Sequence, residues 1–208
     1  MKYILNSKTI LGGVQYEVTV PAVRDRVVQQ ALKNVLEPIF DRDFHPSSYG
    51  YRPGKSCQHA IAKAERFMNR YGLTYVADMD LSKCFDTLNH EMIIRAVSRK
   101  VSDGKILNLV RQFLKSGVME SGAVKETELG TAQGGPISPL IMNIYLDEFD
   151  QKMKADGIRI VRYADDILIF GKTREQAGRH MAAAIKILEK DLKLKVNREK
   201  TCITSTYQ

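Results

Sequence analysis

Residues 158–170 read IRIVRYADDILIF, two runs of mostly apolar residues on either side of Tyr163-Ala164-Asp165-Asp166. Runs of β-branched residues separated by a tight turn are typical of a β-hairpin, and they place the two aspartates at its tip. Adjacent carboxylates repel each other and are costly to bury, so a cation would stabilise them. Aspartate is also an ordinary turn residue, so the hairpin alone leaves both interpretations open.

A second strand that carries a carboxylate favours the cation-binding interpretation. Residues 75–81 read YVADMDL, a short strand with a carboxylate, Asp80, where a core strand would carry an apolar residue. If the two strands present Asp80 and Asp165 to one point, their oxygens suit divalent cations, and a pair of such ions supports in-line phosphoryl transfer. Asp78 shares the strand face of Asp80 and stays an alternative ligand.

The composition is that of a globular domain with an excess of basic residues. The chain has 208 residues, 44% of them hydrophobic, and 32 Lys and Arg against 24 Asp and Glu give a net charge of +8. This length can bury a core, and the positive charge favours a polyanionic partner. Cys57, Cys84 and Cys202 have no metal-ligand spacing and indicate reduced thiols in a cytoplasmic protein. No apolar run reaches the length of a membrane span and no signal peptide is recognised, so we expect no membrane partner.

Local signals predict the other helices and strands. A hairpin over residues 2–20 turns at Gly12-Gly13, and Met119–Leu129 forms another. Helices begin after Pro21, Ser56, Asn89, Ser102, Ser138 and Thr173, where a proline or a capping side chain stands. The first of these helices ends or bends at Pro38 and carries one apolar stripe, made of Val23, Val27, Ala31, Leu32, Val35 and Leu36. Helices interleaved with mostly antiparallel hairpins predict an α+β fold.

Several segments match a known family in order and spacing. They are residues 24–32 (RDRVVQQAL), 48–54 (SYGYRPG), 75–85, 130–140 (GTAQGGPISPL), 163–166 and 192–201 (LKLKVNREKT). Together they resemble the motifs of reverse transcriptases, and most closely those of bacterial group II intron-encoded reverse transcriptases (maturases). The resemblance implies the fingers and palm subdomains of a right-hand polymerase, with an antiparallel palm sheet backed by helices. We expect fingers at residues 1–74 and palm at 75–208, with about 90–130 packing back towards the fingers, and no thumb in this fragment.

The resemblance also implies an RNA-directed DNA polymerase that uses two Mg²⁺ ions, with Mn²⁺ as a substitute. It implies metal ligands at Asp80, at the backbone carbonyl of Leu81 and at Asp165. Asp166 would be an accessory catalytic carboxylate, although turn structure alone could also explain an aspartate there. Lys200 would protonate the leaving pyrophosphate, although a surface lysine is the simpler interpretation.

The nucleotide-contacting residues implied by the resemblance are Phe85, Gln133 and Gly134. The Phe85 ring would exclude a 2′-hydroxyl and so select dNTPs, whereas an isolated phenylalanine is more commonly a core residue. Gln133 and Gly134 precede a helix N-terminus, and glycine permits close approach of the backbone to a ligand.

RNA contact is predicted from two local patterns. His59, Lys63, Arg66 and Arg70 recur at helical spacing and would track phosphates, unless they only form a solvated helix face. Tyr49, Tyr51 and Arg52 form an aromatic and basic cluster suited to stacking on template bases.

The expected partners are intron RNA, an RNA template, a DNA primer and dNTPs, and a homodimer stays open. One departure matters: relatives usually carry a nucleotide-contacting arginine where this chain has Tyr16. The alternatives are therefore a catalytically weak RNA-binding splicing factor and another bacterial retroelement enzyme, of the retron or diversity-generating type. The activity of the isolated fragment also stays open.

Overall fold

The computed structural model describes residues 3–11, 14–115, 118–120, 123–125, 129–131 and 134–205. The chain forms two compact units, each built from two separate stretches of sequence: residues 1–42 with 85–144, and residues 43–84 with 145–208. These units are not the sequential halves 1–74 and 75–208, so the predicted division into fingers and palm remains a prediction.

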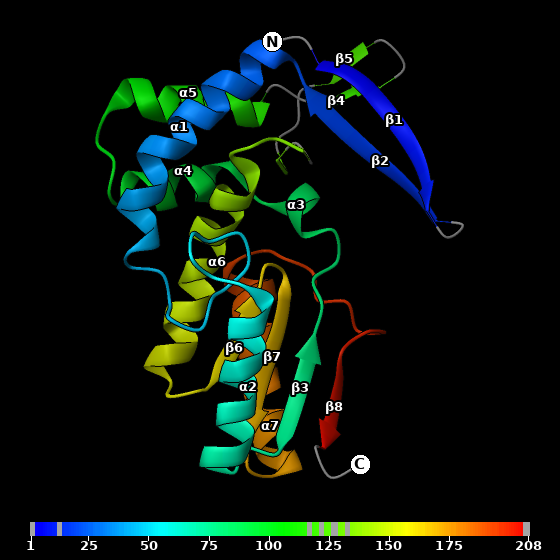
Figure 1. The fold of residues 1–208 in the computed structure, drawn as a ribbon, viewed down its shortest axis with the longest axis vertical. Helices are drawn as coiled ribbons and strands as arrows, with labels where there is room; N and C mark the ends of the chain where they lie inside the picture. Colours follow the sequence, from blue (N-terminus) through cyan, green and yellow to red (C-terminus); the bar gives the residue numbers. More distant parts are fainter. Residues whose placement is uncertain are drawn as a thin grey trace. The chain divides into compact units, whose positions relative to one another are not determined.

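The first unit combines one long helix with shorter helices and two antiparallel hairpins (Figure 1). Strands β1 (Tyr3–Leu11) and β2 (Val14–Pro21) pair with each other, as do β4 (Val118–Glu120) and β5 (Ala123–Lys125). The sequence predicted both hairpins, and their turns lie outside the described residues. Helix α4 (His90–Ser98) packs against α5 (Gly104–Lys115), and the short α3 (Cys84–Thr87) precedes them.

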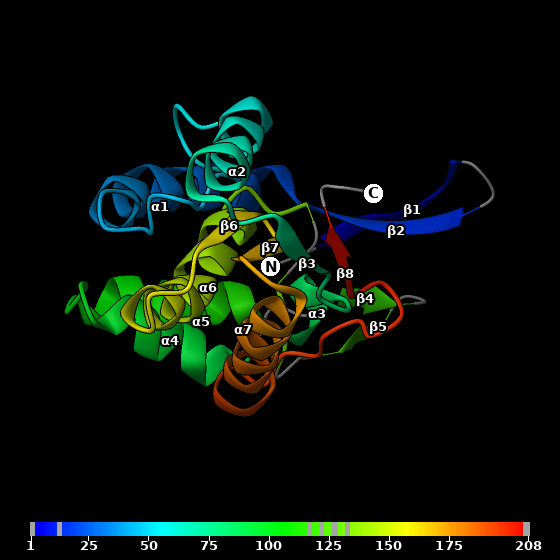
Figure 2. The ribbon, with the colours of Figure 1, turned by 90° about the horizontal axis from the view of Figure 1, so that it is seen from below.

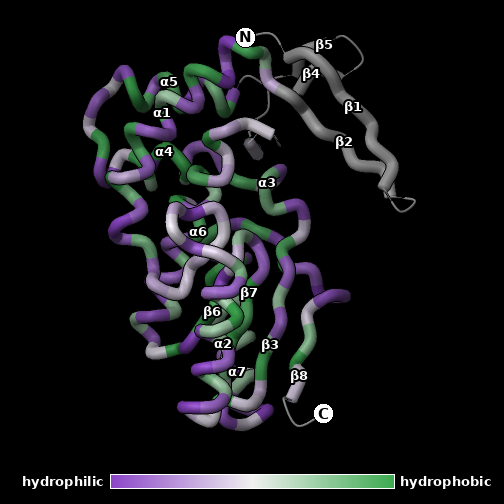
Figure 3. The backbone as a smooth tube through the Cα atoms, in the orientation of Figure 1, coloured by the Kyte–Doolittle hydropathy of each residue, from purple (hydrophilic) through white to green (hydrophobic). Residues whose placement is uncertain are grey.

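Helix α1 (Val23–Asp41) buries Leu32 and Leu36 of the predicted stripe, but not its valines. Its buried residues are Gln29, Leu32, Leu36 and Phe40, whereas Val23, Val27 and Val35 are 73%, 64% and 55% exposed. The predicted stripe merged two rows that a helical period of 3.6 residues places on opposite sides of the helix. Figure 3 shows the resulting alternation of hydrophobic and hydrophilic bands along α1. The helix also continues through Pro38, so of the two predicted effects of this proline, an end or a bend, the end is wrong.

Capping side chains begin several helices as predicted. The side chain of Ser56 accepts from the His59 N–H at the start of α2 (Cys57–Tyr71), and that of Asn89 accepts from Met92 at the start of α4. At α5 the capping residue is Asp103 instead of Ser102, because its Oδ1 accepts from both Lys105 and Ile106.

The second unit contains a four-stranded antiparallel sheet in the order β6-β7-β3-β8. The strands are β3 (Tyr75–Met79), β6 (Ile160–Tyr163), β7 (Asp166–Gly171) and β8 (Cys202–Ser205). Helices α2 and α7 (Arg174–Lys186) lie on opposite faces of this sheet (Figure 2). A π-helical turn, η1 (Ile187–Asp191), continues α7, and α6 (Ser138–Ala155) supplies its residues from Tyr145 onward to this unit. The predicted α+β fold, with an antiparallel sheet backed by helices, is confirmed.

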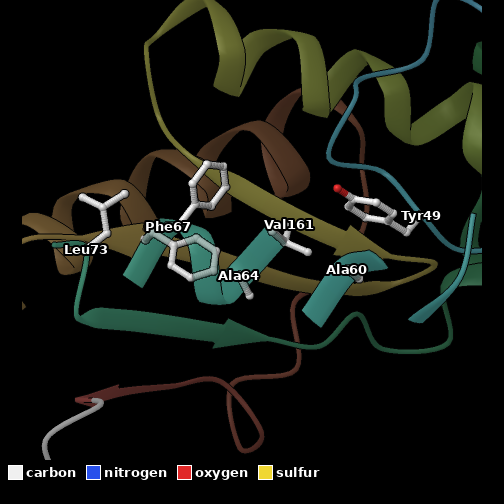
Figure 4. Packing of buried hydrophobic residues seen from close by; sticks show 7 residues of the cluster. Tyr49, Ala60, Ala64, Phe67, Leu73 and Val161 are labelled. Atoms are coloured by element: carbon white, nitrogen blue, oxygen red, sulfur yellow. The ribbon is translucent and has the colours of Figure 1, made fainter. Parts of the chain in front are cut away.

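An apolar cluster fixes α2 on the sheet (Figure 4). It consists of Tyr49, Ala60, Ala64, Phe67, Leu73, Val161 and Phe170. The rings of Phe67 and Phe170 meet edge to face with centroids 5.3 Å apart. Such an aromatic pair adds about 1 kcal/mol to the stabilisation from apolar burial. The small side chains of Ala60 and Ala64 leave room for this close approach, because large residues at those helix positions would hold α2 away from the strands.

Candidate active site

Sheet pairing brings the two acidic segments together. In the antiparallel pair β3–β7, Met79 lies opposite Ile167, so the next residue of β3, Asp80, reaches the level of Asp166. Tyr163 pairs with Asp166 across the β6–β7 hairpin, which leaves Ala164 and Asp165 as a two-residue turn. The end of β3 therefore places Asp80 beside Asp166, and Asp165 is the turn residue that precedes Asp166.

The electrostatics of this strand end reflect that proximity. Partial burial raises the pKa of Asp166, and the negative charges of Asp165, Asp80 and Asp78 raise it further, while Lys200 acts in the opposite direction. Like charges disfavour one another's ionised form, so the shift identifies these carboxylates as electrostatic neighbours. A cation bound here would relieve their repulsion.

Asp80 also has partners from the segment that follows η1. Asn197 Nδ2 donates to Asp80 Oδ2 at 3.0 Å, and Lys200 Nζ lies 3.7 Å from the same oxygen. The backbone pairs as well: Asn197 N donates to Asp80 O, and Ser82 N donates to Lys195 O. Buried Leu81 forms an isolated bridge with Val196. Sequence reasoning assigned Asn197 no role, because its contact with Asp80 crosses 117 positions of the chain.

The donor set fits Mg²⁺ better than a soft metal. Within the described residues, no group of three or more His, Cys, Asp or Glu side chains is arranged to hold a metal ion. Mg²⁺ is commonly bound by only one or two carboxylates, with substrate phosphates and water completing its octahedron. Asp80 and Asp165 supply such hard oxygens, and burial together with the neighbouring carboxylates raises the pKa of Asp166. These residues would hold the ions, with the carbonyl of Leu81 as a further oxygen.

The nucleotide-contacting candidates belong to the other compact unit. Phe85 is half-buried on α3, and its carbonyl accepts from Thr131 N at 2.7 Å. Gly130 N donates to Leu88 O, and His90 Nε2 donates to Gly130 O, both at 2.7 Å. These bonds connect the segment that carries Phe85 to the one that leads to Gly134. Gly134 itself is exposed with a φ of 103°, and Gln133 lies outside the described residues.

The predicted RNA-contacting residues divide by exposure. His59, Arg66 and Arg70 lie on the exposed face of α2, while Lys63 is half-buried with its Nζ over the Phe67 ring at 5.0 Å.

The candidate residues in the loop before α2 also differ in exposure. Tyr51 is 56% exposed, but Tyr49 belongs to the core cluster and is only 7% exposed. Arg52 donates to the carbonyls of His45 and Ser48 and lies over the Phe44 ring.

Helices that could cross a membrane are absent from the part of the chain that the structure describes, since none is both long and apolar enough.

Solved structures of telomerase share this fold. The apo telomerase of Candida tropicalis superposes with a TM-score of 0.67 over 93% of this chain and 43% of that one, at 14% sequence identity. The C-terminally truncated form of that telomerase gives a TM-score of 0.64 over 94% of this chain. The chain therefore shares its fold with these telomerases.

Sequence comparison identifies the family. The family model described as "Reverse transcriptase (RNA-dependent DNA polymerase)" matches residues 7–208, and the chain belongs to that family. Protein YkfC of Escherichia coli (strain K12) is 35% identical, over 88% of this chain and 58% of its own length. The group II intron-encoded protein LtrA of Lactococcus lactis subsp. cremoris is 36% identical, over 66% of this chain and 23% of its own length. The chain thus spans little more than half of YkfC and about a quarter of LtrA.

Proposed function

We propose that the chain is the catalytic part of an RNA-directed DNA polymerase encoded by a group II intron. The observation that carries the proposal is the convergence of Asp80, Asp165 and Asp166 at one end of the sheet, with Lys200 Nζ 3.7 Å from Asp80. Family membership and the similarity to LtrA support the same function. The reaction would extend a DNA primer on an RNA template with dNTPs, in the service of intron mobility.

Each residue of the acidic cluster has a defined part in this proposal. Asp80 and Asp165 would hold two Mg²⁺ ions, with the Leu81 carbonyl as a further ligand. When bound, such ions lower the pKa of a primer 3′-hydroxyl and neutralise the charge of a triphosphate. Asp166 adds negative charge that strengthens cation binding. Lys200 has an exposed side chain that can leave Asp80 and give a proton to the departing pyrophosphate.

Nucleotide selection belongs to the other unit. Phe85 would block the space below the ribose, and Gln133 and Gly134 would contact the incoming nucleotide. The two hydrogen bonds from Gly130 and Thr131 to the α3 region give Phe85 a fixed backbone. Such fixation is what a steric selector needs, since a displaced ring would no longer exclude a 2′-hydroxyl.

A second candidate function is binding of intron RNA that assists splicing without efficient polymerisation. The exposed basic residues of α2 and exposed Tyr51 favour it, as does Tyr16 in the position of the usual arginine. RNA binding through phosphates needs only positive charge and accessible side chains, so it would survive loss of the acidic cluster.

Primer extension on an RNA template distinguishes the two functions. We expect the protein to incorporate dNTPs in the presence of Mg²⁺ or Mn²⁺, and Asp165→Asn to abolish incorporation while RNA binding persists. The substitution removes a metal-binding charge at nearly constant volume, so the melting temperature should change little. The matched control is Asp156→Asn, which makes the same change at an exposed aspartate just after α6. Near-normal extension by Asp165→Asn would refute the metal assignment, and RNA binding without any extension by the native chain would favour the splicing function.

A further inference from the structure

Beneath the hairpin tip lies a completely buried ion pair that the proposed reaction does not use. Arg162 of β6 and Asp150 of α6 are both 0% exposed. Arg162 Nε donates to both carboxylate oxygens, at 2.9 and 3.0 Å, and Nη2 donates to Oδ2 at 2.7 Å. A buried ion pair provides little net stability compared with well-packed apolar residues. The hydrogen bonds to Asp150 do, however, fix the orientation of the planar Arg162 guanidinium.

The remaining guanidinium nitrogen points to the catalytic turn. Arg162 Nη1 donates to the carbonyl oxygen of Ala164 at 2.8 Å. That oxygen belongs to the peptide bond between Ala164 and Asp165. The position of the oxygen therefore fixes the orientation of this peptide and of the Asp165 residue that follows it. Ala164 has a φ of 58°, a conformation that L-residues other than glycine adopt only at a cost in free energy. A charge-assisted hydrogen bond to its carbonyl compensates for that cost.

A loop from the same unit holds the turn from another side. Arg162 N donates to Ser47 O and Tyr49 N donates to Arg162 O, both at 2.9 Å, so residues 47–49 pair with the strand beside the turn. Next along this loop, Gly50 lies directly against Ala164: a Cβ on Gly50 would stand 2.2 Å from Ala164 N. The turn is therefore enclosed by backbone and by a guanidinium whose own carboxylate partner comes from a helix.

We propose that Arg162, oriented by Asp150, is a positioning residue that keeps the Ala164–Asp165 turn in its strained conformation and so directs the Asp165 carboxylate toward the metal site. The inference rests on the proposed function for its consequence, because a misdirected Asp165 would weaken metal binding and slow nucleotidyl transfer. It does not require Arg162 to touch nucleotide, primer or metal.

The test is Arg162→Lys, which keeps the charge but replaces the rigid, planar guanidinium fork by one ammonium group on a flexible chain. Binding of Mn²⁺ alone, followed by the loss of the free-ion signal in electron paramagnetic resonance, should weaken about 10-fold, as when other outer partners of metal ligands are removed. In primer extension kcat should fall about 100-fold, as expected for a misplacement near 1 Å, while KM for dNTP and the Kd for primer–template stay unchanged.

The control for general destabilisation is Met153→Ala. Met153 lies on α6, one turn from Asp150, and is likewise 0% exposed, but its thioether side chain offers the turn no hydrogen-bond donor. The substitution should lower the melting temperature and leave Mn²⁺ binding and kcat near native values below that temperature. If Arg162→Lys behaves in the same way, the ion pair is only structural and the inference is overturned.

Ala164→Gly provides a rescue, because glycine adopts positive φ without strain. Added to Arg162→Lys, it should restore much of the Mn²⁺ affinity without restoring the melting temperature; restored stability without restored affinity would overturn the inference. If Arg162→Lys does not fold, Asp150→Asn serves with the same readouts, since it removes the charge that orients the guanidinium. Failure of the native chain to extend a primer would refute the proposed function instead, and the Mn²⁺ measurement would still decide the role of Arg162.

Discussion

Gly50→Ala tests, with one methyl group, the contact between the loop of residues 47–50 and the Ala164–Asp165 turn. Position 50 is adjacent to backbone: the added Cβ would stand 2.2 Å from Ala164 N, 2.9 Å from its Cα and 3.0 Å from its Cβ. The nearest contact is thus about 1 Å too short for van der Waals packing. A flexible side chain could rotate away, but a backbone nitrogen in a two-residue turn cannot, so either the loop or the turn must shift.

The expected cost follows from that shift. Overpacking of a rigid site costs about 1–3 kcal/mol, and rigid neighbours on both sides place Gly50→Ala at the upper end. Displacing the loop also strains the hydrogen bond from Tyr49 N to Arg162 O, which adds about 1 kcal/mol. The free energy of unfolding should therefore fall by about 3–4 kcal/mol, a large part of the typical 5–15 kcal/mol for a folded protein. For a chain of this size, that loss lowers Tm by roughly 10 °C.

Thermal unfolding followed by circular dichroism measures this effect, with Gly104→Ala as the matched control. Gly104 begins α5, and a methyl group added there would have no heavy atom of another segment within 4 Å. Alanine at this position should therefore change stability by no more than about 0.5 kcal/mol, in the stabilising direction. A Gly50→Ala melting temperature within about 2 °C of the native value would refute the reasoning, because less than 1 kcal/mol would then be lost. The loop would not lie against the turn in solution.

Three further outcomes are expected. Phe85→Val should lower the ratio of kcat/KM for dNTP over NTP, because truncating the ring opens space below the 2′ carbon; an unchanged ratio would make Phe85 a packing residue. Replacing Lys63, Arg66 and Arg70 together by Ala should weaken RNA binding and flatten the slope of log K against log salt by up to roughly two units, at about 0.7 per lost single-strand contact, whereas an unchanged slope would mean that this face is only solvated. Burial lowers the pKa of His45 below its ordinary 6.5, with Lys154, Arg162 and Lys63 acting in the same direction and Asp150 against it, and Nδ1 accepts from Ser47 N. The unfolded chain therefore takes up the proton first as pH falls through 6.5, so stability should decline below that pH in the native protein and less in His45→Asn, and equal declines would contradict the assignment.

Most strands, though not β8, and most helix starts could be predicted because their signals are local. Short runs of apolar and β-branched residues identified β3, β6 and β7, and the caps at Ser56, Asn89 and Thr173 follow from hydrogen bonds that span three residues. The sequence could predict that Asp80 and Asp165 lie close together only if their strands are neighbours in the sheet. Strand order is not a local property, so the sequence does not settle it. The pairing of β3 with β7 supplies what the sequence could not.

The face that α1 buries was predicted only in part, because valine content alone does not decide burial. Leu32, Leu36 and Phe40 form a row of larger side chains, and burial of this row removes more apolar surface from water than burial of Val23, Val27 and Val35 would. Gln29 joins the buried row although it is polar, which a count of apolar residues cannot anticipate. Size within a row should therefore weigh more than the number of apolar residues in it.

Arg162 shows a different limit of sequence reasoning. Inside an apolar strand an arginine is expected to face solvent, because burying a charge without a partner is prohibitively costly. Its partner, Asp150, lies on the preceding helix, 12 residues earlier, among the apolar residues Phe149 and Met153. Each charge alone would be costly to bury among apolar residues. That cost is offset only when the strand and the helix pack together and the two charges pair. A basic residue in an apolar strand and an acidic residue on the apolar face of the preceding helix therefore predict a buried pair jointly, although neither predicts it alone. Since the strand leads directly into the turn of Asp165, such a pair also indicates where the fold keeps a carboxylate in a fixed direction.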